Sequence, residues 1–303
     1  MTGAGSGELL FAHEDSFAGS LVDADSDGTP DVFAVGRNPS IEELSIDNQL
    51  ERLREGDSVW SQESVKTNFR GGLNITATVS NDVHKEIEKL VFNAGGTAMQ
   101  PGLTSSARFF AGAQYPSGEA LEAYRGVIPV EYSIEYSQGE MVTYSLDLLY
   151  ADQEPTSTDL SGATRVSSGT SVPFHGVDLT VDGASVVDLQ SATLTISDIG
   201  RFQYGASPTA NRGVVANPQA SLDVEAILTR PDLLDLARGA ADSSPPDTLD
   251  SVTGSLALSA GGTTVSTYNL ASLTPDSHSW NNLLATDDTT DQVQFHVNGV
   301  TIS

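Results

Sequence analysis

The stretch 68–79 reads NFRGGLNITATV, and a related stretch, NPQASLDVEAIL, occupies 217–228, an offset of 149 residues. Apolar and polar residues alternate in both, which is the period-two pattern of a half-buried β-strand. A helix pattern follows each stretch, over 82–92 and 231–240. The chain therefore repeats a strand-then-helix block. Its apolar positions match one for one: Leu73 with Leu222, Ile75 with Val224, Ala77 with Ala226 and Val79 with Leu228.

Two flanking blocks recur in the same order. Upstream, Leu44-Ser45-Ile46 matches Leu194-Thr195-Ile196, and downstream Val142-x-Tyr144-x-Leu146 matches Val293-x-Phe295-x-Val297. Three blocks at offsets of 149–151 indicate an internal repeat. The sequence predicts a mainly β chain of two similar β-sandwich or barrel-like domains, each with a short flanking helix. We place the domains at 1–152, which includes an N-terminal arm, and at 153–303, with a linker within 151–175.

The remaining pattern favours strands. A long hairpin is expected over 130–150, where Ser137-Gln138-Gly139-Glu140 supplies the turn. The segment 41–54 fits either a helix or a strand. The stretches 95–126 and 202–218 are expected to be long loops with a binding task. Further strands are expected at 177–182, 191–197, 221–229, 253–259, 263–270 and 292–302.

Composition excludes several classes of protein. The 303 residues carry a net charge of −27, which repels phosphate backbones, and they contain no cysteine for disulfides or thiolate metal sites. No apolar run has the roughly 18–20 residues that span a bilayer, and we expect no secretory signal. So acidic a chain with few lysines suits molar salt, where the Debye length is only about 3 Å. We interpret the source as halophilic; an acidic mesophilic protein is the alternative.

The sequence contains few motifs that indicate catalysis or cofactor binding. The five histidines are scattered, and no hydrolase, zinc-protease, dinucleotide or P-loop pattern occurs, so we expect no enzyme and no required cofactor. Trp60 and Trp280 are expected in the core or in an interface. Residues 23–31 begin like a calcium loop, although Ala34 stands where a bidentate acid should close the shell. The hypothesis is a Ca²⁺ or other cation site, against a solvated acidic turn, with the candidate ligands Asp23, Asp25, Asp27 and Asp31.

A family resemblance rests on several segments of this sequence. They are Asn38–Leu44, the following Asp47-Asn48-x-Leu50-x-Arg52-Leu53-Arg54, Glu63–Gly71, Ser80-Asn81-Asp82, the hairpin 132–150 and the block 190–236. On these residues the chain resembles the major tail tube proteins of siphovirus-type tailed viruses, in particular those that infect haloarchaea. The resemblance covers most of 38–303, and the Asp-rich loop lies outside it.

The resemblance implies a structural virion protein. It implies sandwiches whose inner sheets join between subunits into a ring, and rings that stack into a hollow tail tube for DNA delivery. A chain with two tube-like halves would form a pseudo-hexamer from three copies. The implied partners are further copies, the tape measure, tail terminator and baseplate proteins, and DNA that passes without specific binding. The implied location is the virion tail, after assembly in the host cytoplasm, with no membrane association.

The same resemblance gives the two faces of the repeated strand a role. Leu73, Ile75, Ala77 and Val79, with Leu222, Val224, Ala226 and Leu228, would pack against the helices. The polar alternates would face the channel, where hydroxyls and carboxylates let DNA slide. The channel-facing candidates are Asn74, Thr76, Thr78, Asp223 and Glu225.

Two other functions stay open at this point. A cell-surface or secreted β-module of a halophile, such as an adhesion or S-layer segment, would explain the acidity, the strands and the calcium-like loop. The expected absence of a signal peptide and the strand-helix repeat speak against it. A hydrolase or carbohydrate-binding enzyme on a β-sandwich lacks any assembled site in the sequence.

Overall fold

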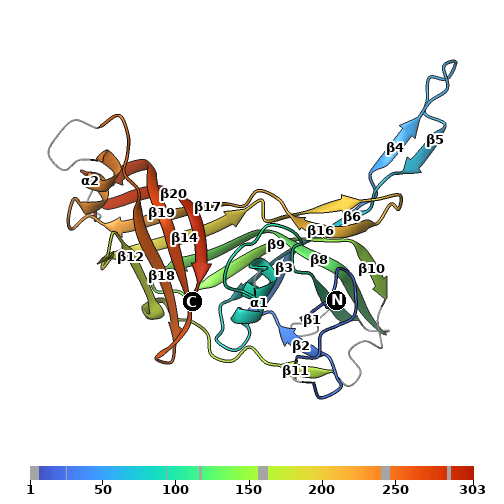
Figure 1. Cartoon of the computed structure of the whole chain (residues 1–303), viewed down its shortest axis with the longest axis horizontal. Helices are drawn as coiled ribbons and strands as arrows, with labels where there is room; N and C mark the ends of the chain where they lie inside the picture. The colour runs from blue at the N-terminus through green and yellow to red at the C-terminus, as the bar shows by residue number, and fades with distance from the viewer. Residues whose placement is uncertain are drawn as a thin grey trace.

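The computed structural model describes residues 7–24, 26–93, 95–115, 118–155, 163–239, 246–284 and 288–303, with side chains left out for 113–120. Over these ranges the chain is mainly β (Figure 1). The helices described are α1 (His84–Val91), α2 (Asp232–Arg238) and the 3₁₀ turn η1 (Phe174–Gly176). Neither α-helix in these ranges has the length and apolar character needed to cross a bilayer.

The strands fall into a first half (residues 7–155) and a second half (residues 177–302). The first half holds β1 (Gly7–His13), β2 (Asp31–Ala34), β3 (Arg37–Asp47), β4 (Leu50–Leu53), β5 (Glu63–Lys66), β6 (Arg70–Thr78), β7 (Ala107–Tyr115), β8 (Gly118–Ser137), β9 (Thr143–Tyr150) and β10 (Asp152–Pro155). Between the halves lies β11 (Thr164–Val166). The second half holds β12 (Val177–Val181), β13 (Ala184–Ser185), β14 (Leu189–Ser197), β15 (Gly200–Tyr204), β16 (Ala210–Val215), β17 (Gln219–Ile227), β18 (Val252–Ala260), β19 (Thr263–Asn281) and β20 (Thr290–Ile302).

One large mixed sheet of 16 strands runs through both halves, and its long strand β8 connects them. The first part of β8 pairs with β7 and β10, and its last part pairs with β9 on one side and β14 on the other. The middle of the sheet has the order β3-β6-β9-β8-β14-β17-β20-β19. We call these eight strands the central sheet. Figure 1 shows it crossing the molecule, with α1 below it and α2 at the far left.

Strand pairing in the two halves follows one pattern. Strand β6 lies between β3 and β9, and Leu73 faces Leu44 and Leu148. Strand β17 lies between β14 and β20, and Leu222 faces Leu194 and Phe295. The register agrees with the expected match of Leu44 to Leu194. It differs for the third block, because the partners of Ile75 and Val224 are Leu146 and Val293, four residues from the expected alignment.

Several sequence-based expectations are corrected by the strands. The ambiguous segment 41–54 is extended, in β3 and β4. The stretch 95–126 is not a loop, since it contains β7 and the start of β8, and 202–218 holds most of the hairpin β15–β16. The expected linker supplies β10 and β11, and β11 pairs in parallel with β2; residues 156–162 lie outside the described residues. The expected N-terminal arm contributes β1 to the sheet.

The apolar face of the repeated strands is buried. Leu73, Ile75, Ala77 and Val79 are within 2 % exposure and share one apolar cluster with Ile87, Leu90 and Val91 of α1. In the second half Leu222, Val224 and Ala226 are buried, and Leu233 and Leu236 of α2 are half-buried against the same cluster. Leu228 follows the end of β17 and is only half-buried.

A buried polar network ties α1 to the second half. The Tyr132 hydroxyl lies 3.0 Å from His84 Nε2 and 2.9 Å from the Tyr268 hydroxyl, which donates a hydrogen bond to Glu88. Burial raises the pKa of Glu88 to about 7 and lowers the pKa of His84 to about 3. Between about pH 3 and pH 7 both side chains are therefore neutral: Glu88 keeps its proton and His84 carries none beyond its neutral form.

The network predicts a pH-dependent stability. Because the folded state favours the protonated carboxyl of Glu88, the stability of the native chain falls as pH rises from about 4.5 through 7. Glu88→Gln keeps an acceptor for Tyr268 and removes the titration, so it is expected to raise the free energy of unfolding at pH 8 by about 3 kcal/mol relative to the native chain. At pH 4 the two chains should differ little. Denaturant unfolding at both pH values measures this.

Glu86→Gln on the same helix is the matched control. Burial opposes ionisation of Glu86, but hydrogen bonds with His13 and Lys89 together hold its pKa below the usual value. Removing that charge should therefore lower stability at pH 8. An equal loss of stability in both variants would contradict the assignment of Glu88 as a protonated group.

Candidate functional site

One face of the central sheet carries four rows of polar side chains. Each row across its strands runs from partner to partner without an apolar residue. The rows are Glu43-Asn74-Asp147-Glu131, then Thr76-Ser145-Ser133-Thr195-Ser221-His296-Thr274, then Thr143-Glu135-Thr193-Asp223-Gln294-Ser277, and finally Ser137-Ser191-Glu225-Gln292-Ser279. We call this surface the polar face. Its named rows hold six carboxylates and no Lys or Arg. They therefore present hydroxyls and negative charge, and no cationic side chain that would bind a phosphate group.

Carboxylates on the polar face affect one another. The pKa of Glu131 is raised by partial burial and by the nearby charges of Asp147 and Asp198. The amide of Asn74 donates a hydrogen bond to Asp147, which anchors that carboxylate beside Glu131. Burial also raises the pKa of Asp223, although a hydrogen bond from Gln294 opposes the shift. A shallow hollow of about 250 Å³ lies over Asp223 and Glu225.

The channel candidates occupy this surface unequally. Asn74, Thr76 and Glu225 are half-exposed and Asp223 is exposed. Thr78 is buried, opposite Arg37 at the end of β6, where the Arg37 guanidinium turns to the carbonyl of Gly169. Four of the five candidates that the alternation predicted therefore lie on an accessible surface. Whether that surface lines a channel stays a prediction.

Each end of the central sheet carries a free strand edge. Within the described residues, β3 pairs with β6 alone, and residues 274–281 of β19 pair with β20 alone. Large apolar side chains are exposed at both edges: Leu44 and Ile46 on β3, and Trp280 on β19. An unpaired edge with apolar side chains is a template for another strand.

The hairpin β4–β5 projects away from the body at the upper right of Figure 1. We call residues 50–66 the projecting hairpin. Its exposed apolar side chains include Leu50, Leu53, Val59 and Trp60, the last 81 % exposed. Neither Trp60 nor Trp280 is in the core, so the core expectation is wrong for both, and an interface role stays a prediction. The alternation of apolar and polar residues does not predict that these apolar side chains are exposed.

The Asp-rich loop uses its carboxylates on its own backbone. Asp23 accepts hydrogen bonds from the amides of Asp27 and Gly28, Asp27 from Thr29, and Asp31 from the amide of Ala24. Asp25 lies outside the described residues. Among the residues that are described, no group of three or more His, Cys, Asp or Glu is arranged to hold a metal ion. Cation binding at 23–31 stays a prediction.

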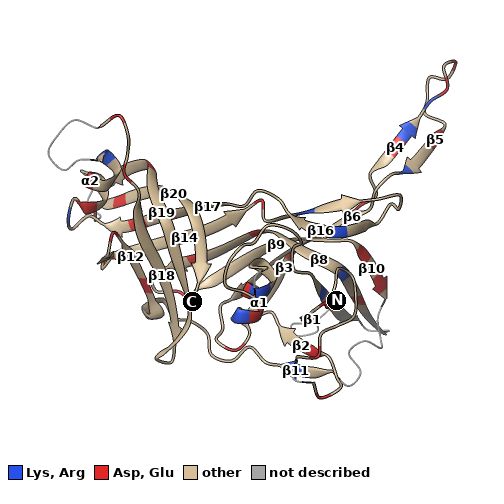
Figure 2. Cartoon of the chain, in the orientation of Figure 1, with Lys and Arg blue, Asp and Glu red and all other residues tan. Residues whose placement is uncertain are grey.

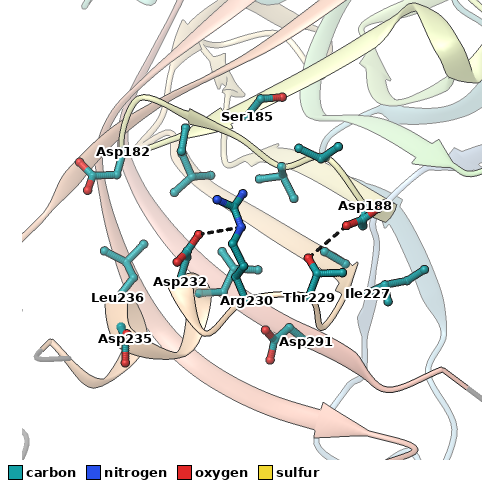
Figure 3. Close-up of a pocket in the computed structure, with 16 residues that line it drawn as sticks. Asp182, Ser185, Asp188, Ile227, Thr229, Arg230, Asp232, Asp235, Leu236 and Asp291 are labelled. Atoms are coloured by element: carbon teal, nitrogen blue, oxygen red, sulfur yellow. Dashed lines mark hydrogen bonds and ion pairs between the residues drawn. The ribbon is translucent and has the colours of Figure 1, made fainter. Parts of the chain in front are cut away.

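A cavity of about 370 Å³ lies between α2, the end of β17 and the hairpin β12–β13 (Figure 3). Arg230 is paired with Asp232 at 3.5 Å, and the Thr229 hydroxyl donates to Asp188 at 3.1 Å. Carboxylates dominate the labelled lining, and Figure 2 shows the same excess of acidic residues across the described chain. We assign this cavity no role.

A β-sheet with a polar face, free edges and an exposed hairpin defines a building block for an assembly. The family model described as "Phage tail tube protein" matches residues 61–277, more than two thirds of the chain. The chain belongs to the phage tail tube protein family. Among curated proteins, none matches the chain. Membership of this family makes the chain a structural component of a viral tail that assembles with copies of itself.

The paired carboxylates of the polar face give a direct prediction. Asp147→Asn should lower the pKa of Glu131 toward its ordinary value, because the nearest negative charge is removed while the burial stays. Side-chain carboxyl NMR titration measures it. Asp198→Asn should lower the pKa by less, and Asp223→Asn on the other half should leave it unchanged. A Glu131 pKa that does not respond to Asp147→Asn would contradict the described geometry.

Proposed function

We propose that copies of this chain join through their sheet edges into closed rings, and that the rings stack into the tail tube through which viral DNA is delivered. The observation that carries the proposal is the central sheet, which ends in two free edges and has four rows of polar side chains on one face. Ring closure would pair every such edge, which removes the hazard of uncontrolled strand addition. Family membership supports the tube as the resulting assembly.

We further propose that the chain is a duplicated tube protein and that a ring holds three copies. The support is the common pairing pattern of β3-β6-β9-β8 and β14-β17-β20-β19. Three copies of this eight-stranded sheet make a ring of 24 strands. With strands about 4.8 Å apart and tilted by about 40°, such a ring is roughly 45 to 50 Å across between backbone centres. Duplex DNA fits within that width.

In this assembly the polar face lines the channel. Asn74, Thr76, Asp223 and Glu225 would then face the DNA, and their oxygens would repel or only weakly contact its phosphates. The apolar face, with the helices, would form the outer wall. Thr78 takes no part in this proposal because it is buried.

The source and setting belong to the same proposal. A net charge of −27 suits a haloarchaeal host, where molar salt screens the repulsion between stacked copies. We propose a siphovirus-type tail assembled in the host cytoplasm, with the tape measure, terminator and baseplate proteins as further partners and no catalytic role. The cell-surface module is not favoured, because the family match concerns a tail component.

The assembly is tested by negative-stain electron microscopy of the purified chain in molar salt, with masses of the discrete species. The expected result is rings or hollow tubes with three chains per ring. Six chains per ring would retain the tube and contradict the duplication. A protein that stays monomeric at every concentration and salt would count against self-assembly of the chain alone.

The channel assignment has its own test. Asp223→Lys with Glu225→Lys places two ammonium groups on the polar face, so tubes of this variant should retain short duplex DNA at the lowest salt that preserves them, whereas native tubes should not. Asp247→Lys with Asp250→Lys makes the same charge change in an exposed loop outside that face. Equal retention by both variants would refute the channel assignment; retention by the first alone, lost on adding salt, is the expected outcome.

A further inference from the structure

The geometry points to a specific contact between copies: β3 of one copy pairs antiparallel with the free end of β19 of the next, with Leu44 opposite Trp280. The same contact brings the projecting hairpin of the first copy onto the second half of its neighbour. This inference rests on the proposed function, since the partner is a second copy of the chain. It is derived from a contact that the chain already makes within itself.

The internal contact is the pairing of β8 with β14, where the second half meets the first. Leu194 faces Ile134, Thr195 faces Ser133 and Ile196 faces Tyr132, in antiparallel register. The apolar side chains of this junction are fully buried. The junction therefore shows how β14, the first central-sheet strand of the second half, pairs with the edge strand β8 of the first half.

Strand β19 is the counterpart of β8 in detail. Pro129 faces Leu148 on β9, and a register shift follows it; Pro275 faces Phe295 on β20, and a register shift follows it as well. Beyond the shift, Ile134 faces Tyr144 and Trp280 faces Asp291. A bulge is a specific feature of a strand, so its recurrence beside a proline fixes the alignment of Ile134 with Trp280.

Strand β3 is likewise the counterpart of β14. Leu44 faces Leu73 as Leu194 faces Leu222, and these two leucines of β6 and β17 hold the same place in the repeat. Replacing each strand of the internal junction by its counterpart gives the register between copies. Leu44 then faces Trp280, Ser45 faces Ser279, and Ile46 faces His278.

The apolar side chains at these edge positions are exposed, as expected where a partner strand is missing. Leu44, Ile46 and Trp280 are 45 %, 55 % and 42 % exposed. Their counterparts in the internal junction, Leu194, Ile196 and Ile134, are buried. Side chains of the same kind, at the same place in the repeat, are covered where a neighbouring half is present and uncovered where the chain ends its sheet.

The two helices differ in the same way: within the described residues, α1 is covered by the other half of the chain, and α2 is not. Helix α1 belongs to the first half and packs across the junction, with its buried Glu88 bonded to Tyr268 of β19. Five of its residues are buried, whereas α2, the helix of the second half, has no buried residue. The first half of a neighbouring copy would lie against α2 as the second half lies against α1.

The hairpins give the third correspondence. The hairpin β15–β16 lies over the first half, where Phe202 packs with Ile128 and Ala151, and the Tyr204 hydroxyl donates to the carbonyl of Phe69 at 3.0 Å. The projecting hairpin holds the same place between β3 and β6, and its apolar side chains Leu50, Leu53, Val59 and Trp60 are exposed in the part of the chain that the structure describes. In the paired arrangement it lies over the second half of the next copy, where Thr274 and His296 of the polar face are open.

Cysteine cross-linking tests the register, and the native chain contains no cysteine to interfere. Ser45→Cys with Ser279→Cys places two thiols opposite each other in different copies, at the spacing of a cross-strand pair. Within one chain they lie on opposite ends of eight strands, roughly 34 Å apart along the sheet. Mild oxidation in molar salt should give a ladder of covalent dimers and trimers that ends at three chains and collapses on reduction.

The off-register control is Ser45→Cys with Ser277→Cys, which moves one thiol by two residues, about 7 Å along the strand. Its cross-linking yield should be at least tenfold lower. As a second measurement, Leu44→Lys and Trp280→Lys alter exposed side chains, so each should abolish rings while leaving the melting temperature of the monomer unchanged.

The outcomes distinguish a failure of the proposed register from a failure of the proposed tube assembly. Rings or tubes in the microscope with equal or greater cross-linking of the off-register pair, or rings that survive both lysine variants, would overturn the register and leave the tube intact. A chain that forms neither rings nor cross-linked species would overturn both. Preferential cross-linking of Ser45 with Ser279 in rings supports both.

Discussion

An open β-sheet leaves backbone donors and acceptors unpaired along its two outer strands, and this constraint organises the chain. In most monomers the outer strands are short, charged or covered. Here the edges of the central sheet carry Leu44, Ile46 and Trp280, which strengthen rather than weaken the attraction of another strand. In the proposed ring each copy would cover the edge of the next, which would remove these exposed edges.

Alternation in the sequence predicted the strands that are buried on one face and open on the other. Leu73, Ile75 and Ala77 are such residues, and so are Leu222, Val224 and Ala226, because a period of two reports one covered face directly. The alternation criterion failed over 95–126, where it predicted a loop. Phe109, Phe110 and Ala111 are consecutive apolar residues and all are buried, so this strand shows no alternation. A strand covered on both sides does not reveal its period.

The matching blocks could be found in the sequence, but the register of the third block could not. The upstream match of Leu44 with Leu194 was correct because both precede a hairpin of similar length. The downstream match was wrong by four residues, since bulges and connections of different length separate β6 from β9 and β17 from β20. Alternation repeats every two residues, and a shift of four preserves it. The exposure of Trp280 could not be predicted either. A tryptophan on a strand is buried or exposed according to whether another strand lies beside it, and the alternation does not show which strands are at the edge of the sheet.

The internal junction also explains why two linked halves are useful to an assembling protein. One of every two junctions in the proposed ring is made within the chain, where the effective concentration of the partner strand is fixed by a covalent connection. That junction is reinforced by the buried contact of Glu88 with Tyr268, so the two halves fold as one sheet. Only the remaining junctions depend on protein concentration. The proposed ring of three copies therefore contains three junctions between molecules, where a ring of six separate halves would contain six. Each copy carries an apolar edge at one end of its sheet and the complementary edge at the other.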